Sequence, residues 1–392
     1  MLALRLARGA HPLVQLRRLL VAAASAGTGF LLLCTLAYAM EHPGAGAVLR
    51  LAWCLAPITA TVYFAVAVAR TDPGTRPRSG LSAVGLGPGR LMVLAAISTA
   101  VSCVLGSMVA LLFFLHLRGD IRGLPFDGAA TDLLAGGEPL PLAGALTLLA
   151  LVPVAASAAS ALVLRPRSVK TTGAADGAEP AADPDAPARP PGGLPWGVAL
   201  LAAGLAVETY ASGSGGRASG GFPMPGGGAD GSPVGVLAGW ALTALGLVLA
   251  GPGLTWLSGR ILQAVRPGAV RLLAGRVLQE EARRIGRPLG VLCAVASGAY
   301  ASLILYAGPS PRMGPLTTLG GLLVAGCAVL TLATAAVEAK QSRSHTTGAL
   351  LRLGAPATLL RGSAALRAGA LAIVFGPLTW IVAELAALPL AR

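Results

Sequence analysis

The sequence predicts an all-α, polytopic integral membrane protein with about nine membrane-spanning helices and no large extracellular domain. Of its 392 residues, 55% are hydrophobic and only 12% are charged, and the mean hydropathy is +0.73. The hydrophobic residues gather in runs that are long enough to cross a bilayer. A soluble domain of this length could not bury so much apolar surface, so the lipid bilayer is the first predicted partner.

The spans follow from the length of these runs, because a helix needs about 20 apolar residues to cross the hydrocarbon core. The fifth stretch, "LPWGVALLAAGLAVETYA", is the shortest. The predicted spans are residues 19–40, 47–69, 91–116, 140–164, 194–211, 234–257, 289–307, 316–337 and 366–389.

The basic residues predict the orientation, because cytoplasmic loops retain Arg and Lys. With the N-terminus inside, the inner segments hold 24 of the 30 basic residues. This asymmetry predicts a multi-pass protein of the cell membrane with a cytoplasmic N-terminus and an extracellular C-terminus. It also explains the net charge of +14, so no nucleic-acid partner is expected. The six outer arginines are Arg50, Arg118, Arg122, Arg217, Arg312 and Arg392.

The N-terminus also fits a second interpretation. The segment "RLARGAHPLVQLRR", the apolar run after it and Ala37-Tyr38-Ala39 resemble a signal peptide with its cleavage site. The apolar run is too long for the hydrophobic part of a signal peptide. We therefore expect it to be retained as the first span.

Composition divides the chain into four parts. Residues 171–193 are rich in Pro, Ala and Asp without periodicity, which predicts a disordered cytoplasmic linker. The outer loop 212–233 is Gly-rich and too short to fold as a domain. The predicted parts are an N-terminal membrane half (1–170, four spans), the linker (171–193), two connecting spans (194–257) and a C-terminal membrane half (258–392, three spans).

The two halves share an internal repeat. The segment "LALRLARG" before the first span reappears as "LAGRVLQEEARR" before the seventh. Pairing Arg5 with Arg276 and Gly85 with Gly354 gives separations of 80 and 78 residues within the two copies. Each copy then runs through a span, a short outer loop, a second span and a charged inner loop, which predicts a duplication.

Each of these inner loops contains a short segment that ends in glycine, "GLSAVGLGPGRLM" at 80–92 and "GALLRLGAPATLL" at 348–360. Glycine suits the left-handed backbone at a helix C-terminus. Two such apolar segments on the cytoplasmic side could dock a soluble partner, or could lie in the headgroups as interfacial helices anchored by their arginines. The candidate docking residues are Leu81, Val84 and Gly85 in the first copy and Leu350, Leu353 and Gly354 in the second.

At these residues the chain resembles the FtsX-like permease family, the membrane subunits of MacB-type ABC transporters. The similarity rests on "RSHTTGALLRLGAPATLLRGSAALRAGAL" and, more loosely, on "RPRSGLSAVGLGPGRLMVLAAI". The resemblance implies that each loop carries a coupling helix for a separate ABC ATPase subunit, which would bind ATP and Mg. The duplicated form of the family typically has ten spans, and many members have a large extracellular domain. The resemblance leaves open whether one chain or a homodimer completes the transporter.

The sequence predicts that the chain is not itself an enzyme, and no catalytic residue is expected. ATP binding needs GxxxxGK[ST], but Lys170-Thr171 lacks the preceding glycines and Lys340 precedes Gln341. The cysteines fall in apolar runs and no histidine pairs with them, so neither disulfides nor a metal site are expected.

Two acidic residues lie inside predicted spans, Glu208 in the fifth and Glu384 in the ninth. Charged groups are costly within a bilayer and persist there mainly for function. Both stand near the outer end of their span, where we expect them to reach headgroups or water. The alternative is that they contact a substrate or a proton.

These features predict the permease subunit of an ABC transporter, which exports or extracts a lipid- or peptide-like substrate. A non-transporting membrane sensor, immunity or assembly protein is the first alternative. The second is a proton-coupled transporter that uses Glu384.

Overall fold

The computed structural model describes eleven segments of the chain and confirms the predicted all-α, polytopic fold. Within these segments, nine helices are long and apolar enough to cross a membrane. A two-residue antiparallel pair of strands, β1 (Gly221–Phe222) and β2 (Ser232–Pro233), is the only sheet in them. The described residues are 12–42, 44–72, 88–121, 128–131, 134–165, 191–213, 221–222, 232–264, 268–305, 314–354 and 356–387.

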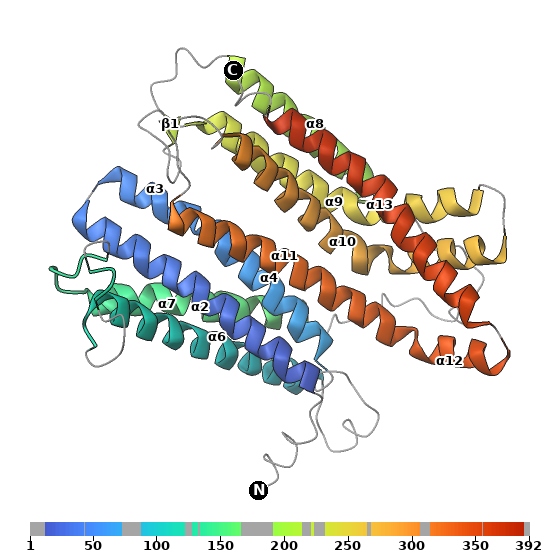
Figure 1. Ribbon diagram of the computed structural model, residues 1–392, viewed down its shortest axis with the longest axis horizontal. Helices are drawn as coiled ribbons and strands as arrows, with labels where there is room; N and C mark the ends of the chain where they lie inside the picture. Colours follow the sequence, from blue (N-terminus) through green and yellow to red (C-terminus); the bar gives the residue numbers. More distant parts are fainter. Residues whose placement is uncertain are drawn as a thin grey trace, which may run out of the picture.

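The helices fall into two successive sets along the chain (Figure 1). The first set is α2 (Pro12–Glu41), α3 (Ala45–Trp53), α4 (Leu55–Thr71), α6 (Pro88–Arg118) and α7 (Leu142–Val163). The second set is α8 (Leu194–Gly213), α9 (Val234–Ala264), α10 (Ala269–Leu305), α11 (Pro315–Ser342), α12 (Ser344–Arg352) and α13 (Ala357–Ala387).

The second and seventh predicted spans differ most from the helices in the structure. The second span is divided at Cys54 into α3 and α4. The ring of Pro57 would clash with the carbonyl four residues earlier, that of Trp53, which is where α3 ends. In contrast, α10 joins the basic segment and the seventh span in one helix of 37 residues.

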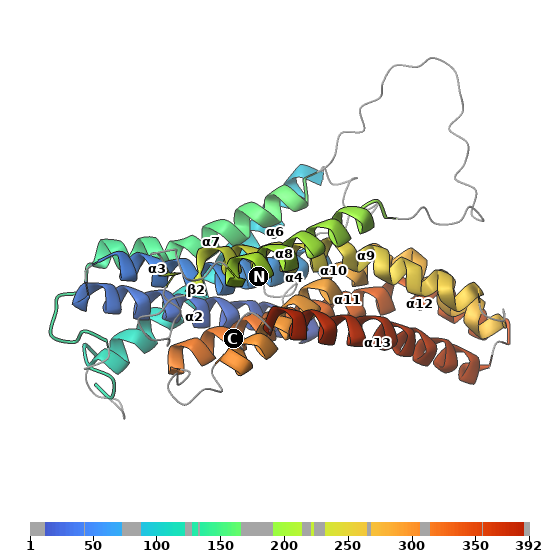
Figure 2. The same ribbon diagram turned by 90° about the horizontal axis from the view of Figure 1, so that it is seen from above.

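The helices form two bundles with one helix between them (Figures 1 and 2). The first bundle contains α2, α4, α6 and α7, and the second contains α8, α9, α10 and α13. Helix α11 packs against α4 of the first bundle and α10 of the second. Its Cys327 joins a buried cluster that includes Phe64 of α4 and Cys103 of α6, so the last third of the chain contributes to the first core.

Close backbone contacts hold α8, α9 and α10 together. A Cβ atom added at Gly246 of α9 would lie 2.5 Å from the backbone nitrogen of Leu201 in α8. One added at Gly286 of α10 would lie 2.5 Å from the Cα of Pro252 in α9. Small residues at such crossings let membrane helices approach until their backbones touch. The second bundle is therefore built on a tightly packed layer of three helices.

The packing within each half contains one matching hydrogen bond between the first and third helices of the repeat. In the first half, Ser25 of α2 donates to the carbonyl oxygen of Cys103 in α6 at 2.9 Å. In the second half, Ser297 of α10 donates to the carbonyl oxygen of Thr379 in α13 at 3.2 Å. Helices that correspond in the predicted repeat thus meet through the same kind of contact.

The first residues of α2 and the whole of α12 lie at the same end of the bundles, and α3 lies at the opposite end (Figure 1). The chain is a multi-pass membrane protein by the length and composition of its helices. If the basic loops are cytoplasmic, as predicted, α12 faces the cytoplasm.

Candidate functional site

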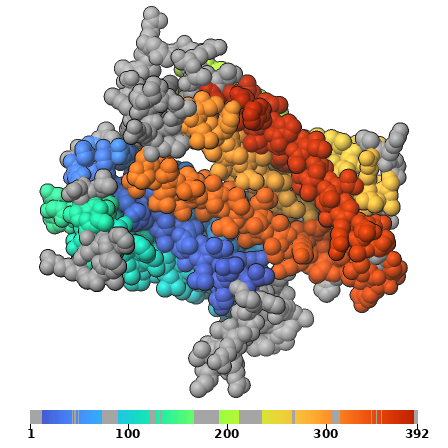
Figure 3. Space-filling model, in the orientation of Figure 1, coloured from blue at the N-terminus to red at the C-terminus, as the bar shows by residue number. Residues whose placement is uncertain are grey.

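Helix α12 protrudes from the end of α11 and lies at a corner of the molecule (Figure 3). Leu353, which follows its last residue, is 84% exposed, and Leu351 is 48% exposed. Leu350 lies within the helix, three residues before Leu353. The predicted apolar segment of the second half is therefore a short helix that presents leucines to its surroundings.

The predicted glycine closes this helix. Gly354 has a φ of +89°, in the left-handed region that side chains disfavour. The backbone N–H of Leu353 donates to Ala349 at 3.0 Å, and that of Gly354 donates to Leu351 at 3.1 Å. These bonds satisfy carbonyls at the end of α12 and turn the chain toward α13.

An ion pair ties the base of α12 to α10. The Nε atom of Arg343, between α11 and α12, lies 2.7 Å from Oε1 of Glu281. The Glu281 side chain is only 8% exposed, and its contact with Arg343 is an ion pair, because the Nε–H of Arg343 donates to the carbonyl oxygen of Ala339. The position of α12 is thereby coupled to the basic part of α10.

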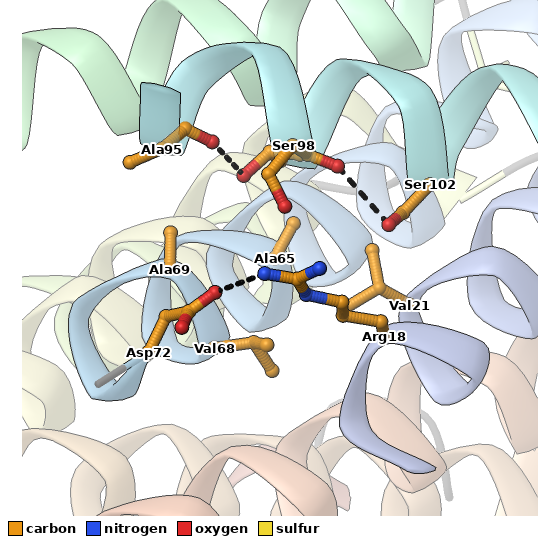
Figure 4. Close-up of a pocket in the computed structure, with 10 residues that line it drawn as sticks. Arg18, Val21, Ala65, Val68, Ala69, Asp72, Ala95, Ser98 and Ser102 are labelled. Atoms are coloured by element: carbon orange, nitrogen blue, oxygen red, sulfur yellow. Dashed lines mark hydrogen bonds and ion pairs between the residues drawn. The ribbon is translucent and has the colours of Figure 1, made fainter. Parts of the chain in front are cut away.

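A second ion pair occupies the corresponding place in the first half (Figure 4). Nη2 of Arg18 in α2 lies 2.6 Å from Oδ2 of Asp72, directly after α4. The neighbouring Arg17 donates to Oγ1 of Thr71 at 3.2 Å. In both halves the start of the first helix is bound to the end of the second, with the acidic and basic partners exchanged.

A small cavity adjoins the Arg18–Asp72 pair between α2, α4 and α6 (Figure 4). Its volume is about 20 Å³, which is enough for one water molecule. Ser98 and Ser102 of α6 line one wall, and the Ser102 hydroxyl donates to the carbonyl oxygen of Ser98. The cavity is too small for a transported molecule.

The candidate residues of the first inner loop, Leu81, Val84 and Gly85, lie outside the described residues. The arrangement of the first docking segment therefore stays a prediction. The described anchor of this loop is the Arg18–Asp72 pair at its start.

Glu208 is placed differently from what the sequence predicts. Its side chain is fully buried between α8 and α9 and does not reach headgroups or water. Thr243 of α9 donates to Oε1 at 3.0 Å, and Oε2 has no hydrogen-bond partner. The burial arises because Gly239 of α9 faces Glu208, leaving room for its methylene groups where any other side chain would clash.

Glu384 is half-buried on α13 and accepts a hydrogen bond from the hydroxyl of Tyr300 in α10 at 2.8 Å. The ring of Tyr300 lies 5.5 Å from that of Trp380, at an interplanar angle of 49°. Sequence reasoning finds Glu384 but not its two aromatic neighbours. Tyr300 stands 84 residues earlier, and only the packing of α10 on α13 reveals it.

An open apolar groove runs along α10 and α13 beside this cluster, with a volume of about 410 Å³. It begins near the middle of α10 and ends at Tyr300. The groove is lined by Leu289, Leu292, Cys293, Ala296 and Tyr300 of α10 and by Phe375, Gly376, Thr379, Trp380 and Ala383 of α13.

Comparisons with models of protein families, with curated proteins and with solved structures give no match to this chain. The resemblance to FtsX-like permeases therefore remains a prediction from the loop segments. In the part of the chain that the structure describes, no group of three or more His, Cys, Asp or Glu side chains could hold a metal ion.

Proposed function

We propose that the chain is the membrane-spanning permease subunit of an ABC transporter and that α12 is one of its two docking elements for a separate ATPase. The observation that carries this proposal is the exposed, glycine-terminated α12, whose Leu353 side chain is 84% exposed. An apolar side chain on a short projecting helix can insert into a groove of a soluble partner. The first inner loop supplies the second element.

The contacts of α12 offer a route by which the ATPase would move the spans. A displacement of α12 acts on Arg343, and the ion pair to Glu281 passes it to α10. At a rise of 1.5 Å per residue, α10 is about 55 Å long, well beyond the roughly 30 Å of hydrocarbon. Its Gly286 contact with α9 then moves both helices together. ATP and Mg bind to the partner subunit in this scheme.

The residues at the opposite end suit export or extraction of an amphiphilic substrate. The groove on α10 and α13 is largely apolar and ends at Tyr300 and Trp380, beside Glu384. Because α10 carries both the groove and the Glu281 contact, movement of this helix would change the groove when the ATPase acts. The transporter would reside in the cell membrane, with α12 on the cytoplasmic side.

Co-purification from mild detergent tests the docking role. Leu353→Asp places a charge at the centre of the proposed contact and should reduce recovery of the ATPase at least about tenfold, as for an interface hot spot. Ser344→Asp is the matched control, because Ser344 is also exposed and lies nine residues earlier, about two and a half turns away on the opposite face. Equal recovery of the ATPase with both variants would refute the proposal.

A further inference from the structure

The groove on α10 and α13 corresponds to the surface that α7 covers in the first half. In α6, Cys103 accepts the hydrogen bond from Ser25, and one turn later Ser107 donates to the carbonyl oxygen of Leu149 in α7 at 3.1 Å. In α13, Thr379 accepts the equivalent bond from Ser297. One turn later stands Ala383, which lines the groove. The helix surface that binds α7 in one half is thus an open groove in the other.

The length of the groove matches one leaflet of a bilayer. From Leu289 to Tyr300, α10 rises about 16 Å at 1.5 Å per residue, and half of the hydrocarbon core is about 15 Å. Its wall is built from leucine, alanine, phenylalanine and cysteine side chains. A single extended alkyl chain fits this apolar channel better than a folded polar molecule does.

The end of the groove carries groups that recognise a cation. The Tyr300 and Trp380 rings lie 5.5 Å apart, and Trp380 is 61% exposed. Aromatic faces attract ammonium groups, and the Glu384 carboxylate beside them supplies the opposite charge. None of the ten lining residues is basic, so a phosphate or sulfate headgroup would find no charged partner there.

We propose that this groove binds an amphiphile with one alkyl chain and a cationic ammonium headgroup. The alkyl chain lies along α10 and α13 from Leu289 toward Tyr300. The ammonium group contacts Trp380, Tyr300 and Glu384. Binding itself needs no ATPase. Only the further step, that such an amphiphile is the transported substrate, rests on the proposed function.

Quenching of Trp380 fluorescence measures this binding in the full chain. The other four tryptophans are replaced by phenylalanine, and the protein is kept in neutral maltoside micelles. The probe is dodecyltrimethylammonium brominated next to its headgroup, and the comparison probes are the equally brominated dodecyl sulfate and dodecyl maltoside. We expect saturable quenching by the ammonium probe. The sulfate and maltoside probes should bind with affinities that are lower by a factor of about ten.

Three variants distinguish recognition of the headgroup from binding of the alkyl chain. Glu384→Gln should weaken the ammonium probe about tenfold while leaving the maltoside probe unchanged. Gly376→Phe fills the groove without adding a tryptophan and should abolish saturable binding of every probe. Gly369→Phe is its control on the same helix, because a Cβ at either glycine meets no atom within 4 Å and Gly369 does not line the groove.

Three results would overturn the assignment. Equal binding of the sulfate and ammonium probes would remove the cationic specificity, and unchanged binding by Gly376→Phe would place the ligand elsewhere. Spontaneous disulfide formation between two Gly376→Cys chains, with no quenching, would assign the groove to a second copy. Because no ATPase is present, loss of the proposed ATPase contact would leave this measurement unaffected.

Discussion

Glu281 and Arg343 form an ion pair that joins the basic part of α10 to the base of α12, with 2.7 Å between carboxylate oxygen and guanidinium nitrogen. Arg18 and Asp72 make a similar ion pair in the first half with the charges exchanged, and in the repeat Asp72 corresponds to Arg343. In each half an ion pair therefore joins the first helix to the end of the second helix. The acidic residue follows α4 in the first half and lies on α10 in the second. This contact is the basis of the first prediction.

Reversing one charge of this pair should release α12. In Arg343→Glu, two carboxylates face each other beside the nearly buried Glu281, which should destabilise the local contact by about 1–3 kcal/mol. The measurement is hydrogen exchange of the α12 amides in the intact protein, which we expect to accelerate. The double variant Glu281→Arg with Arg343→Glu restores opposite charges and should regain most of the protection. Equal exchange in the single and double variants would contradict a direct pairing.

The end of α12 should depend on Gly354. Gly354→Ala forces a side chain into the left-handed region at φ +89°, at a cost of about 1–2 kcal/mol. We expect fraying of α12, seen as faster amide exchange at Leu351 and Arg352. Gly348→Ala, within the same helix, is the control, because the added Cβ meets no atom within 4 Å and alanine favours the helix by about 0.5–1 kcal/mol. The prediction fails if Gly348→Ala frays the helix as much as Gly354→Ala.

Replacing Gly286 by a larger residue should weaken the packing of α9 on α10. A Cβ there would lie 2.5 Å from the Cα of Pro252, so Gly286→Ala must separate the two backbones. Overpacking of this kind costs about 1–3 kcal/mol, which should lower the unfolding temperature of the detergent-solubilised protein.

Gly298→Ala provides the matched control for this packing prediction. It lies on the same helix, and its added Cβ meets no atom within 4 Å. An unchanged or higher unfolding temperature is therefore expected for Gly298→Ala. A comparable loss in both variants would mean that glycine acts through helix flexibility and not through the close approach of α9 and α10.

The sequence by itself determined the fold class, the number of spans and the helix that ends at Gly354. These features depend on local properties, namely the length of apolar runs and the backbone freedom of a single glycine. The nine membrane-length helices among the described residues and the positive φ of Gly354 agree with those expectations. The division of the second span at Cys54 likewise has a local cause, the proline at position 57.

Only the tertiary structure decided which distant residues meet. The burial of Glu208 depends on Gly239 in the next helix, the Glu281–Arg343 pair joins two helices, and Tyr300 reaches Glu384 across 84 residues. The packing of α11 on α4 likewise brings the two halves together. Hydropathy shows that a segment enters the bilayer but not which of its faces meets which neighbour, because lipid and helix interior are both apolar and small residues, not hydrophobicity, select the contacts.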